Sequence, residues 1–164
     1  IYGRFILKIF VTLGSSTQNF NRLLGKIDEL IDENIIKDVV VQSNSSDYVP
    51  KNYKIKNHLN FDEYEKFVKD CDILITHGGV GSIFDGLINN KKIIAFPRMS
   101  EYREAVNDHQ KQIVDKFYND GYILTGKIDD LDKLITNIEK FNPKKYKSNN
   151  KMFNTKLIDI IEKL

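Results

Sequence analysis

The chain has 164 residues, of which 41% are hydrophobic and 29% charged, and these values are ordinary for one globular domain. Its 25 basic and 23 acidic side chains leave a formal net charge of +2, which excludes an argument for nucleic acid as a partner from charge alone. The single cysteine, Cys71, excludes an internal disulfide, and no apolar run approaches the roughly 20 residues that a membrane-spanning helix needs. The sequence does not begin with Met, as expected for a processed chain or a piece of a longer polypeptide.

Strand-like and helix-like segments alternate along the chain. Strands are expected where short apolar runs end at glycine, proline or polar residues, and helices where apolar residues recur every three or four positions. In chain order, the predicted elements are a strand at 8–13, a helix at 20–33, strands at 35–41 and 54–58, a helix at 62–69 capped by Asp62, a strand at 72–76, a helix at 80–88, a strand at 92–96, a helix at 107–118, a strand at 121–124, and helices at 129–140 and 153–164.

This alternation predicts an α/β fold: a Rossmann-like parallel sheet with helices on both faces. We expect residues 1–141 to form this domain, and residues 142–164 to form a basic linker and a C-terminal amphipathic helix. Such a helix covers its own domain, docks on a partner or lies on a membrane surface, and the sequence leaves these three uses open. In a sheet of this kind, ligands bind beyond the carboxyl ends of the strands, near helix N-termini.

The turn at 77–82, with the sequence HGGVGS, is the most informative of the loops. It follows a buried strand and opens a helix, and its three glycines allow a ligand to approach the backbone closely. The N–H groups at a helix start favour an anion, to which His77 and Ser82 can each add a hydrogen bond. We therefore interpret this turn as a phosphate site formed by His77, Gly78, Gly79, Gly81 and Ser82. The alternative is a tight strand-to-helix turn with a surface histidine.

Three further groups of residues are candidates for binding a ligand near the same helix starts. Asp85 lies one turn further into that helix, where a carboxylate can accept both hydroxyls of a ribose. The pair His109-Gln110 begins another helix, and the Gln110 amide offers a donor and an acceptor to adjacent sugar hydroxyls. Gly14-Ser15 repeats the glycine–hydroxyl pattern after the first strand and can form a second wall of the phosphate site. The alternatives are a solvated helix residue, a polar helix start and an ordinary capped turn, respectively.

Other signals do not support a site. Residues 121–127 match the first seven positions of a P-loop, but Ile128 stands where a magnesium-binding hydroxyl is needed. Two Asp-x-Asp pairs, at 70–72 and 130–132, are spaced like metal ligands. The first pair flanks a strand and the second begins a helix, where acids are favoured anyway. We therefore expect no metal site and no cofactor.

Residues 76–110 carry the pattern His-Gly-Gly, Gly-Ser, acid, Pro-Arg and His-Gln in one order. Together with the opening IFVTLGSS at 9–16, this segment resembles the C-terminal, donor-binding domain of glycosyltransferase family 28, which is one half of a GT-B fold. Within that family it is similar to small one-domain members. These are the catalytic subunit of the dolichol-linked second-N-acetylglucosamine transferase and the PssE-type capsule and exopolysaccharide transferase subunits.

The resemblance implies a donor site for a UDP-sugar. The His77 loop would hold the diphosphate, Asp85 the ribose, and Gln110 with His109 the sugar. Asp85 stands where many relatives carry the longer Glu. The uracil would meet the chain at Leu59, Asn60 and Phe61.

The resemblance also implies an inverting, metal-independent transfer to a lipid-linked acceptor in cell-surface polysaccharide synthesis, at the cytoplasmic face of the membrane. A general base must deprotonate the acceptor hydroxyl, and no residue stands out for that role. The chain supplies a donor half and no acceptor half. We therefore expect a membrane-attached partner subunit that supplies the missing half.

Two alternatives stay open. One is a non-catalytic nucleotide-sugar-binding module, whose donor site would look the same. The other is a UDP-sugar 2-epimerase, although such enzymes normally carry both halves in one chain. The sequence does not indicate which sugar is transferred, which acceptor is used or how many copies assemble.

Overall fold

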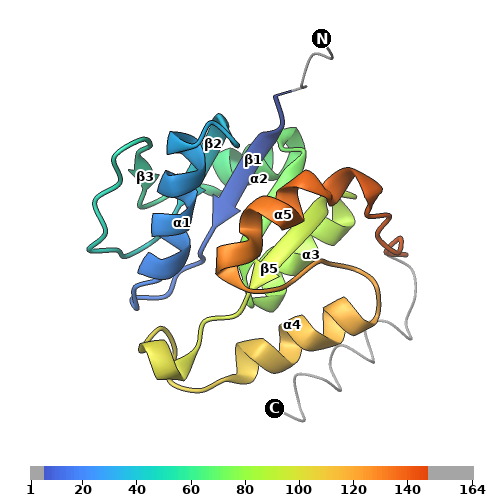
Figure 1. The fold of residues 1–164 in the computed structure, drawn as a ribbon. Helices are drawn as coiled ribbons and strands as arrows, with labels where there is room; N and C mark the ends of the chain where they lie inside the picture. The colour runs from blue at the N-terminus through green and yellow to red at the C-terminus, as the bar shows by residue number, and fades with distance from the viewer. Residues whose placement is uncertain (1–5, 148–164) are drawn as a thin grey trace.

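The computed structural model describes residues 6–147 and places a five-stranded parallel sheet, ordered β3-β2-β1-β4-β5, between helices (Figure 1). The strands are β1 (Lys8–Thr12), β2 (Asp38–Gln42), β3 (Ile55–Lys56), β4 (Ile73–His77) and β5 (Lys92–Phe96). The α-helices are α1 (Asn21–Asp32), α2 (Phe61–Asp70), α3 (Val80–Ile88), α4 (His109–Asn119) and α5 (Leu131–Thr136), and short 3₁₀ turns are η1 (Ser100–Tyr102), η2 (Ile128–Asp130) and η3 (Ile138–Lys140). The predicted fold class is confirmed.

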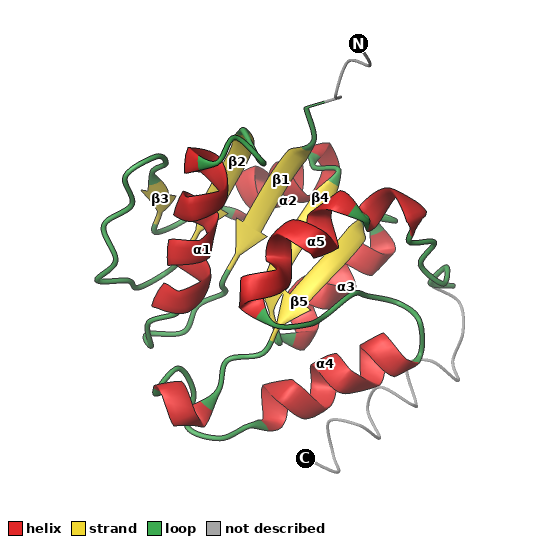
Figure 2. Cartoon of the chain, in the orientation of Figure 1, coloured by secondary structure: helices red, strands yellow, loops and turns green. Residues whose placement is uncertain are grey.

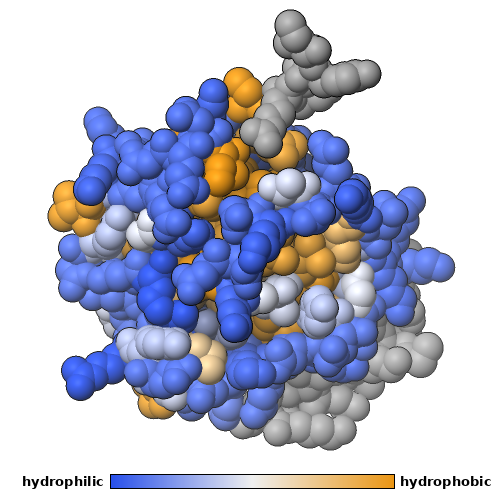
Figure 3. Space-filling view, viewed as in Figure 1, coloured by the Kyte–Doolittle hydropathy of each residue, from blue (hydrophilic) through white to orange (hydrophobic). Residues whose placement is uncertain are grey.

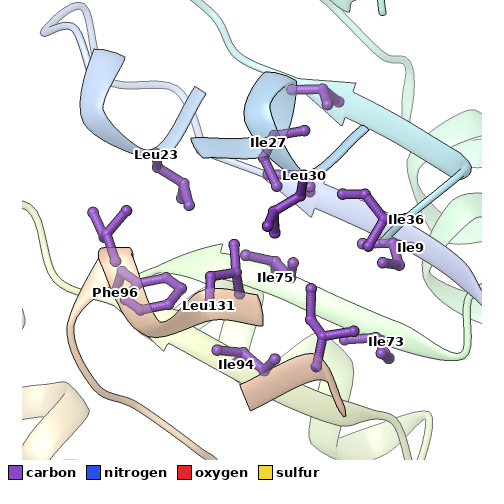
Figure 4. Close-up of a cluster of buried hydrophobic side chains, with 14 of the residues drawn as sticks. Ile9, Leu23, Ile27, Leu30, Ile36, Ile73, Ile75, Ile94, Phe96 and Leu131 are labelled. Atoms are coloured by element: carbon purple, nitrogen blue, oxygen red, sulfur yellow. The ribbon is translucent and has the colours of Figure 1, made fainter. Parts of the chain in front are cut away.

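Side chains alternate between the two faces of the sheet. Along β4, Ile73 and Ile75 pack on one face and Leu74 on the other. The first face is covered by α1 and α5, whose leucines and isoleucines meet those of the strands (Figure 4). The second face is covered by α2, α3 and α4. Figure 2 shows α1 and α5 in front of the sheet and α2 and α3 behind it. Burial on both faces explains why the central strands read as continuous apolar runs.

The order in which the chain adds strands to the sheet reverses between β1 and β4, although the two strands are parallel. From β1 the chain runs outward to β2 and β3, and it then returns to β4 on the other side of β1. The connections therefore leave β1 and β4 toward opposite faces of the sheet, and in folds of this kind ligands bind beyond the carboxyl ends of the strands at such a point. The turns at 13–20 and 77–80 leave the sheet at this edge.

Two predicted elements are shorter than expected. The strand predicted at 121–124 is an isolated bridge between Ile94 and Leu124. It ends there because the Thr125 hydroxyl, in place of a further backbone N–H, donates to Ala95 O at 2.7 Å. The helix predicted at 129–140 splits into η2, α5 and η3, because side chains at its end donate to backbone carbonyls four residues earlier and compete with the helix. The helix predicted at 153–164 lies outside the described residues.

The start of α2 differs from the prediction that Asp62 caps it. Asn60 is the N-cap, and its Oδ1 accepts a hydrogen bond from the Glu63 N–H at 2.9 Å. Glu63 Oε2 in turn accepts from the Asn60 N–H at 3.0 Å, which completes a capping box. The Asp62 prediction is wrong because Asn60 stands one position before the helix, from where its side chain reaches the N–H of the third helical residue.

Residues 142–147 run back across the domain. The Lys144 N–H donates to Gly121 O at 2.9 Å, and the Tyr146 ring meets the Phe84 ring of α3 edge-on, with centroids 5.2 Å apart. Figure 3 shows a mostly hydrophilic surface on the side of α1 and α5, with smaller hydrophobic areas between polar side chains. No helix within residues 6–147 is long and apolar enough to cross a membrane.

Candidate functional site

A row of buried polar side chains closes the carboxyl ends of β2, β1 and β4. Thr12 Oγ1 donates to Gln42 Oε1 at 2.7 Å, and Thr76 Oγ1 donates to Thr12 O at 3.0 Å. Gln42 Nε2 donates to Gly14 O at 3.2 Å, which ties the turn after β1 to the sheet. This row was not predicted from the sequence. The available signal was a polar residue at the end of each apolar strand.

The His77 ring lies in a slot between two glycines from different turns. A Cβ on Gly14 would approach the ring to 2.7 Å, and a Cβ on Gly79 would approach it to 2.3 Å. Both distances are shorter than van der Waals contact allows. The slot therefore needs glycine at both positions, and it places Gly14 beside the His77 turn.

The other two glycines of the turn differ in their surroundings. A Cβ on Gly78 would lie 2.6 Å from Gln110 Cβ, so Gly78 allows α4 to pack against the turn. A Cβ on Gly81 would meet nothing within 4 Å, and Gly81 is exposed. Protein packing thus requires Gly78 but leaves open space beside Gly81, at the start of α3.

The N-terminus of α3 offers backbone donors to a ligand. Gly79 is its N-cap, and no side chain caps the helix. Among residues 6–147, no group accepts a hydrogen bond from the N–H of Val80, Gly81 or Ser82. Free N–H groups at a helix start carry a partial positive charge and favour an anion. Phosphate binding at this turn stays a prediction.

His77 is neutral at pH 7 in the free protein. Burial of the ring lowers the pKa of His77 to about 4, and the positive charge of Arg98 contributes to this shift. A hydrogen bond to the Thr12 backbone opposes the shift in part. The positive charge near the phosphate site therefore comes from Arg98 and the helix, and not from the imidazole.

We infer from the hydrogen bonds around it that the neutral His77 ring carries its proton on Nδ1. The Thr76 hydroxyl donates its one proton to Thr12 O, so it acts as the acceptor in its 3.3 Å contact with His77 Nδ1. Nε2, which lies beside Gly79, is then left with a lone pair. An anion bound at Nε2 requires a proton on this nitrogen, and the ring must take one up if Nδ1 keeps its own.

Tyr64 of α2 joins Ser82 and Asp85 of α3. Its ring packs edge-on against Phe10 with centroids 5.7 Å apart, and its hydroxyl forms hydrogen bonds with Ser82 and Asp85. Burial raises the pKa of Asp85, and the hydrogen bond from Tyr64 opposes that rise. Burial also raises the pKa of Tyr64 to about 12, so the phenol keeps its proton. Tyr64 was not predicted as a site residue. The available signal was its hydroxyl group, which is a polar group on the apolar face of a short helix.

Gln110 connects the turn after β4 to the turn after β5. Its Oε1 accepts hydrogen bonds from the Gly78 N–H at 3.2 Å and from the Arg98 N–H at 3.0 Å. Both partners are donors, so the amide oxygen must face them. Only Nε2 is therefore available to a sugar, and the prediction that Gln110 offers both a donor and an acceptor is wrong for the acceptor. His109 is half-buried at the first position of α4, and its N–H donates to Asn107 Oδ1 at 3.2 Å.

The turn after β1 directs carbonyl groups toward a buried arginine. Arg98 Nη1 donates to Gln18 O at 2.7 Å, and Nη2 donates to Leu13 O at 3.0 Å. Gly14 adopts a φ of +70°, which favours glycine, while Ser15 is exposed. The structure thus brings Gly14 to the His77 slot, and the role of Ser15 in phosphate binding stays a prediction.

The three residues predicted to meet uracil lie at the start of α2. The Asn60 side chain is used by the capping box, and Leu59 packs against the core below the helix. Phe61 is 76% exposed and is the side chain of the three that is free to stack on a base. Tyr64 lies one turn further along and places this helix start beside Ser82 and Asp85.

The two Asp-x-Asp pairs lie apart from the phosphate site. Asp70 and Asp72 precede β4, whereas His77 ends it, and Asp72 Oδ2 accepts a hydrogen bond from the Lys8 N–H at 2.8 Å. Asp130 pairs with Lys133 at 2.6 Å. Within residues 6–147, no cluster of three or more His, Cys, Asp or Glu side chains suits a metal ion. Independence from metal stays a prediction.

Sequence comparison relates the chain to glycosyltransferase subunits. Residues 8–164 match the glycosyltransferase family 28 C-terminal domain. The UDP-N-acetylglucosamine transferase subunit ALG13 of Candida glabrata is 45% identical over 53 residues, which cover 32% of this chain and 25% of the relative. The subunit of the same name from Saccharomyces cerevisiae is 38% identical over 80 residues, which cover 46% of this chain and 37% of the relative. The chain spans less than half the length of these curated relatives.

Solved structures share the fold. An NMR solution structure of ALG13 matches 95% of this chain and 97% of its own, with a TM-score of 0.64 and 22% identity. The spinosyn forosaminyltransferase SpnP matches 83% of this chain but only 35% of its own, with a TM-score of 0.58 and 15% identity. The matching part is thus a fraction of a larger glycosyltransferase, as expected for half of a GT-B fold. Because the family profile covers nearly the whole sequence, the chain belongs to the glycosyltransferase family 28 C-terminal domain family.

Proposed function

We propose that this chain is the donor-binding catalytic subunit of an inverting glycosyltransferase that uses a UDP-sugar. The observation that carries the proposal is the uncapped N-terminus of α3 beside the His77 ring, at the edge where β1 and β4 diverge. This arrangement suits a diphosphate, because free N–H groups and a histidine lie at the same turn, with open space beside Gly81. The names of the relatives favour UDP-N-acetylglucosamine as the first donor to test.

The site's chemistry acts on the leaving group. When the sugar–phosphate bond breaks, negative charge develops on the diphosphate oxygen. The backbone N–H groups of Val80, Gly81 and Ser82 and a protonated His77 stabilise that charge in a fixed position. Asp85 binds the ribose, Gln110 Nε2 donates to a sugar hydroxyl, and Phe61 stacks on the uracil. The transfer then needs no metal ion to bind the diphosphate.

The acceptor side of the reaction is assigned to a partner. The side chains described at the site bind and orient the donor, and none is placed to deprotonate an acceptor hydroxyl. We propose that a membrane-attached subunit supplies that base and binds a lipid-linked acceptor of cell-surface polysaccharide synthesis. The complex then lies at the cytoplasmic face of the membrane. The name "subunit" in the relatives supports an assembly of this kind.

The experiment begins with calorimetry of the full chain with UDP and UDP-N-acetylglucosamine, with ADP as the control nucleotide. Binding of the two uridine ligands and not of ADP is expected. Transfer to a lipid-diphosphate acceptor is then measured with and without the candidate membrane subunit. Turnover is expected only with both subunits, and it should persist in EDTA. Loss of turnover in EDTA with rescue by Mn²⁺ would contradict the metal-independent mechanism.

Two other functions give different results in the same assays. A non-catalytic nucleotide-sugar-binding module binds the donor but shows no transfer with any partner. A UDP-sugar 2-epimerase converts the donor without an acceptor, which mass spectrometry combined with chromatography of the product detects.

A further inference from the structure

Arg98 is one of the largest fully buried side chains of the protein, with 1% of its surface exposed. Its guanidinium donates to three backbone carbonyls of the turn after β1, those of Leu13, Gln18 and Asn19. It also lies over the face of the Phe20 ring, 5.1 Å from the centroid. The Nε–H has no hydrogen-bond partner among residues 6–147.

The charge of Arg98 is not neutralised by a direct ion pair. Within the described part of the chain, the nearby buried acid is Glu104, and both of its oxygens are bound by Arg22, at 2.7 and 2.8 Å. One of these oxygens also accepts from the Met99 N–H. Two arginines thus share one carboxylate. A buried charge without a partner is unfavourable, so this excess of one positive charge requires an explanation.

The guanidinium lies directly behind the proposed diphosphate site. It binds Leu13 O, and the next residue, Gly14, forms one wall of the His77 slot. The Arg98 backbone N–H shares Gln110 Oε1 with the Gly78 N–H, on the other side of the same slot. The effect of the Arg98 charge on His77 agrees with this closeness. Because its side chain is buried, Arg98 acts on a ligand across the turn after β1 and not by contact.

We propose that Arg98 is a positioning residue that also provides the fixed counter-charge for the donor diphosphate, and that it favours nucleotides according to their phosphate charge. The proposal rests on the donor site described under Proposed function. It explains both unusual features of Arg98: the side chain spans the two turns that flank the site, and its charge is left for the ligand to balance. A purely structural arginine would hold the turn equally well for a neutral ligand.

The experiment measures the affinities of UDP, UMP and uridine for the wild type and for variants by NMR titration. Arg98→Met is expected to weaken UDP by about tenfold or more, UMP less, and uridine by less than about twofold, because the lost Coulomb energy scales with ligand charge. Arg98→Lys keeps the charge and is expected to retain the preference for UDP over UMP and for UMP over uridine. This variant tests the proposal if Arg98→Met does not fold. Equal weakening of all three ligands would show that Arg98 is only structural.

Glu104→Gln provides a control with the opposite sign. It disturbs the same loop, since it loosens the contact to Arg22, but it raises the positive charge beside the site. If Arg98 acts through its charge, Glu104→Gln should bind UDP more tightly and uridine unchanged. If Arg98 is only structural, the variant should bind both ligands more weakly. Wild-type protein that binds UDP, but no more tightly than uridine, would overturn this inference alone. Wild-type protein that binds none of the three would overturn the proposed function as well.

Discussion

Two strand-to-helix turns flank the candidate site, and both combine glycine with hydroxyl residues: Gly14–Thr17 after β1 and His77–Ser82 after β4. They differ in the backbone groups that they direct inward. The turn after β4 enters α3 at once and leaves its N–H groups free. The turn after β1 does not enter α1 until Asn21, and its carbonyl groups face Arg98.

This difference gives the two turns different roles, one in binding the ligand and the other in positioning side chains. Free N–H groups attract an anion, whereas inward carbonyls repel one and bind a cation instead. We infer that the turn after β4 binds the diphosphate, while the turn after β1 holds Arg98 and completes the His77 slot through Gly14. Two turns of similar composition therefore have opposite electrostatic roles, and the direction of their backbone groups determines which role each turn has.

The strongest test of the comparison is Gly79→Ala. The new Cβ would lie 2.3 Å from the His77 ring, so the ring must leave its slot. We expect UDP affinity to fall by about 100-fold, which corresponds to roughly 2.7 kcal/mol lost from the histidine and the displaced helix start. Calorimetry measures the loss.

Gly81→Ala is the matched control, because its Cβ meets no protein atom and alanine favours a helix. The fold should be unaffected, so any loss of UDP affinity reports direct contact with the ligand. Gly14→Ala tests the other turn. Its φ of +70° predicts destabilisation by about 1 kcal/mol or more in thermal unfolding. Unchanged UDP affinity in Gly79→Ala would refute the slot as part of the site.

Gln110→Ala tests whether the two sides of the site are coupled. The amide oxygen holds the Gly78 and Arg98 N–H groups, so its loss should loosen the His77 turn. UDP and UDP-sugar should both weaken by about tenfold, with UDP-sugar losing somewhat more through Nε2. A loss confined to the UDP-sugar would mean that Gln110 contacts the sugar and does not position the turn. Gln112→Ala, on the same helix but exposed, should bind normally.

The sequence predicts the parts of this site that depend on a local pattern. The apolar runs and helical spacings predict the sheet and most helices, and the glycines mark the His77 turn because close packing there needs a missing side chain. Tyr64 and the buried contacts of Arg98 and Gln110 depend on partners 12 to 85 residues away along the chain, and no local pattern indicates such pairs. The charge of His77 was also not predictable, because its cause is burial beside Arg98.

The affinity for a UDP-sugar should depend on pH through His77. The pKa of this ring is about 4 in the free protein, and a diphosphate at Nε2 must raise it in the complex. Binding therefore takes up a proton, so affinity should rise as pH falls from neutral toward about 4 and level off below it. We expect about tenfold between pH 7.5 and 5.5, which lies within the limit of tenfold per pH unit that one proton allows.

Calorimetry in buffers of different ionisation enthalpy measures this proton uptake directly. A UDP-sugar is the suitable ligand, because its diphosphate, unlike that of UDP, does not titrate near neutral pH. His77→Asn should bind more weakly and show no such dependence. The same pH profile in His77→Asn would assign the proton to another group.

The smallest expected effect concerns Tyr64, a residue of α2. Its hydroxyl forms hydrogen bonds with Ser82 and Asp85, and the high pKa of the phenol keeps it a donor. If Asp85 binds the ribose, Tyr64 orients that carboxylate without touching the phosphates. Tyr64→Phe keeps the ring packed on Phe10 and removes only the hydroxyl. We expect UDP to weaken by about two- to fivefold, the value of one modest hydrogen bond. The 2′-deoxy analogue of UDP should lose less, because it offers Asp85 one hydroxyl fewer, and Asp85→Asn should remove the difference between the two ligands. Equal losses for UDP and its 2′-deoxy analogue would place the ribose elsewhere, and the site would then consist of the two turns alone.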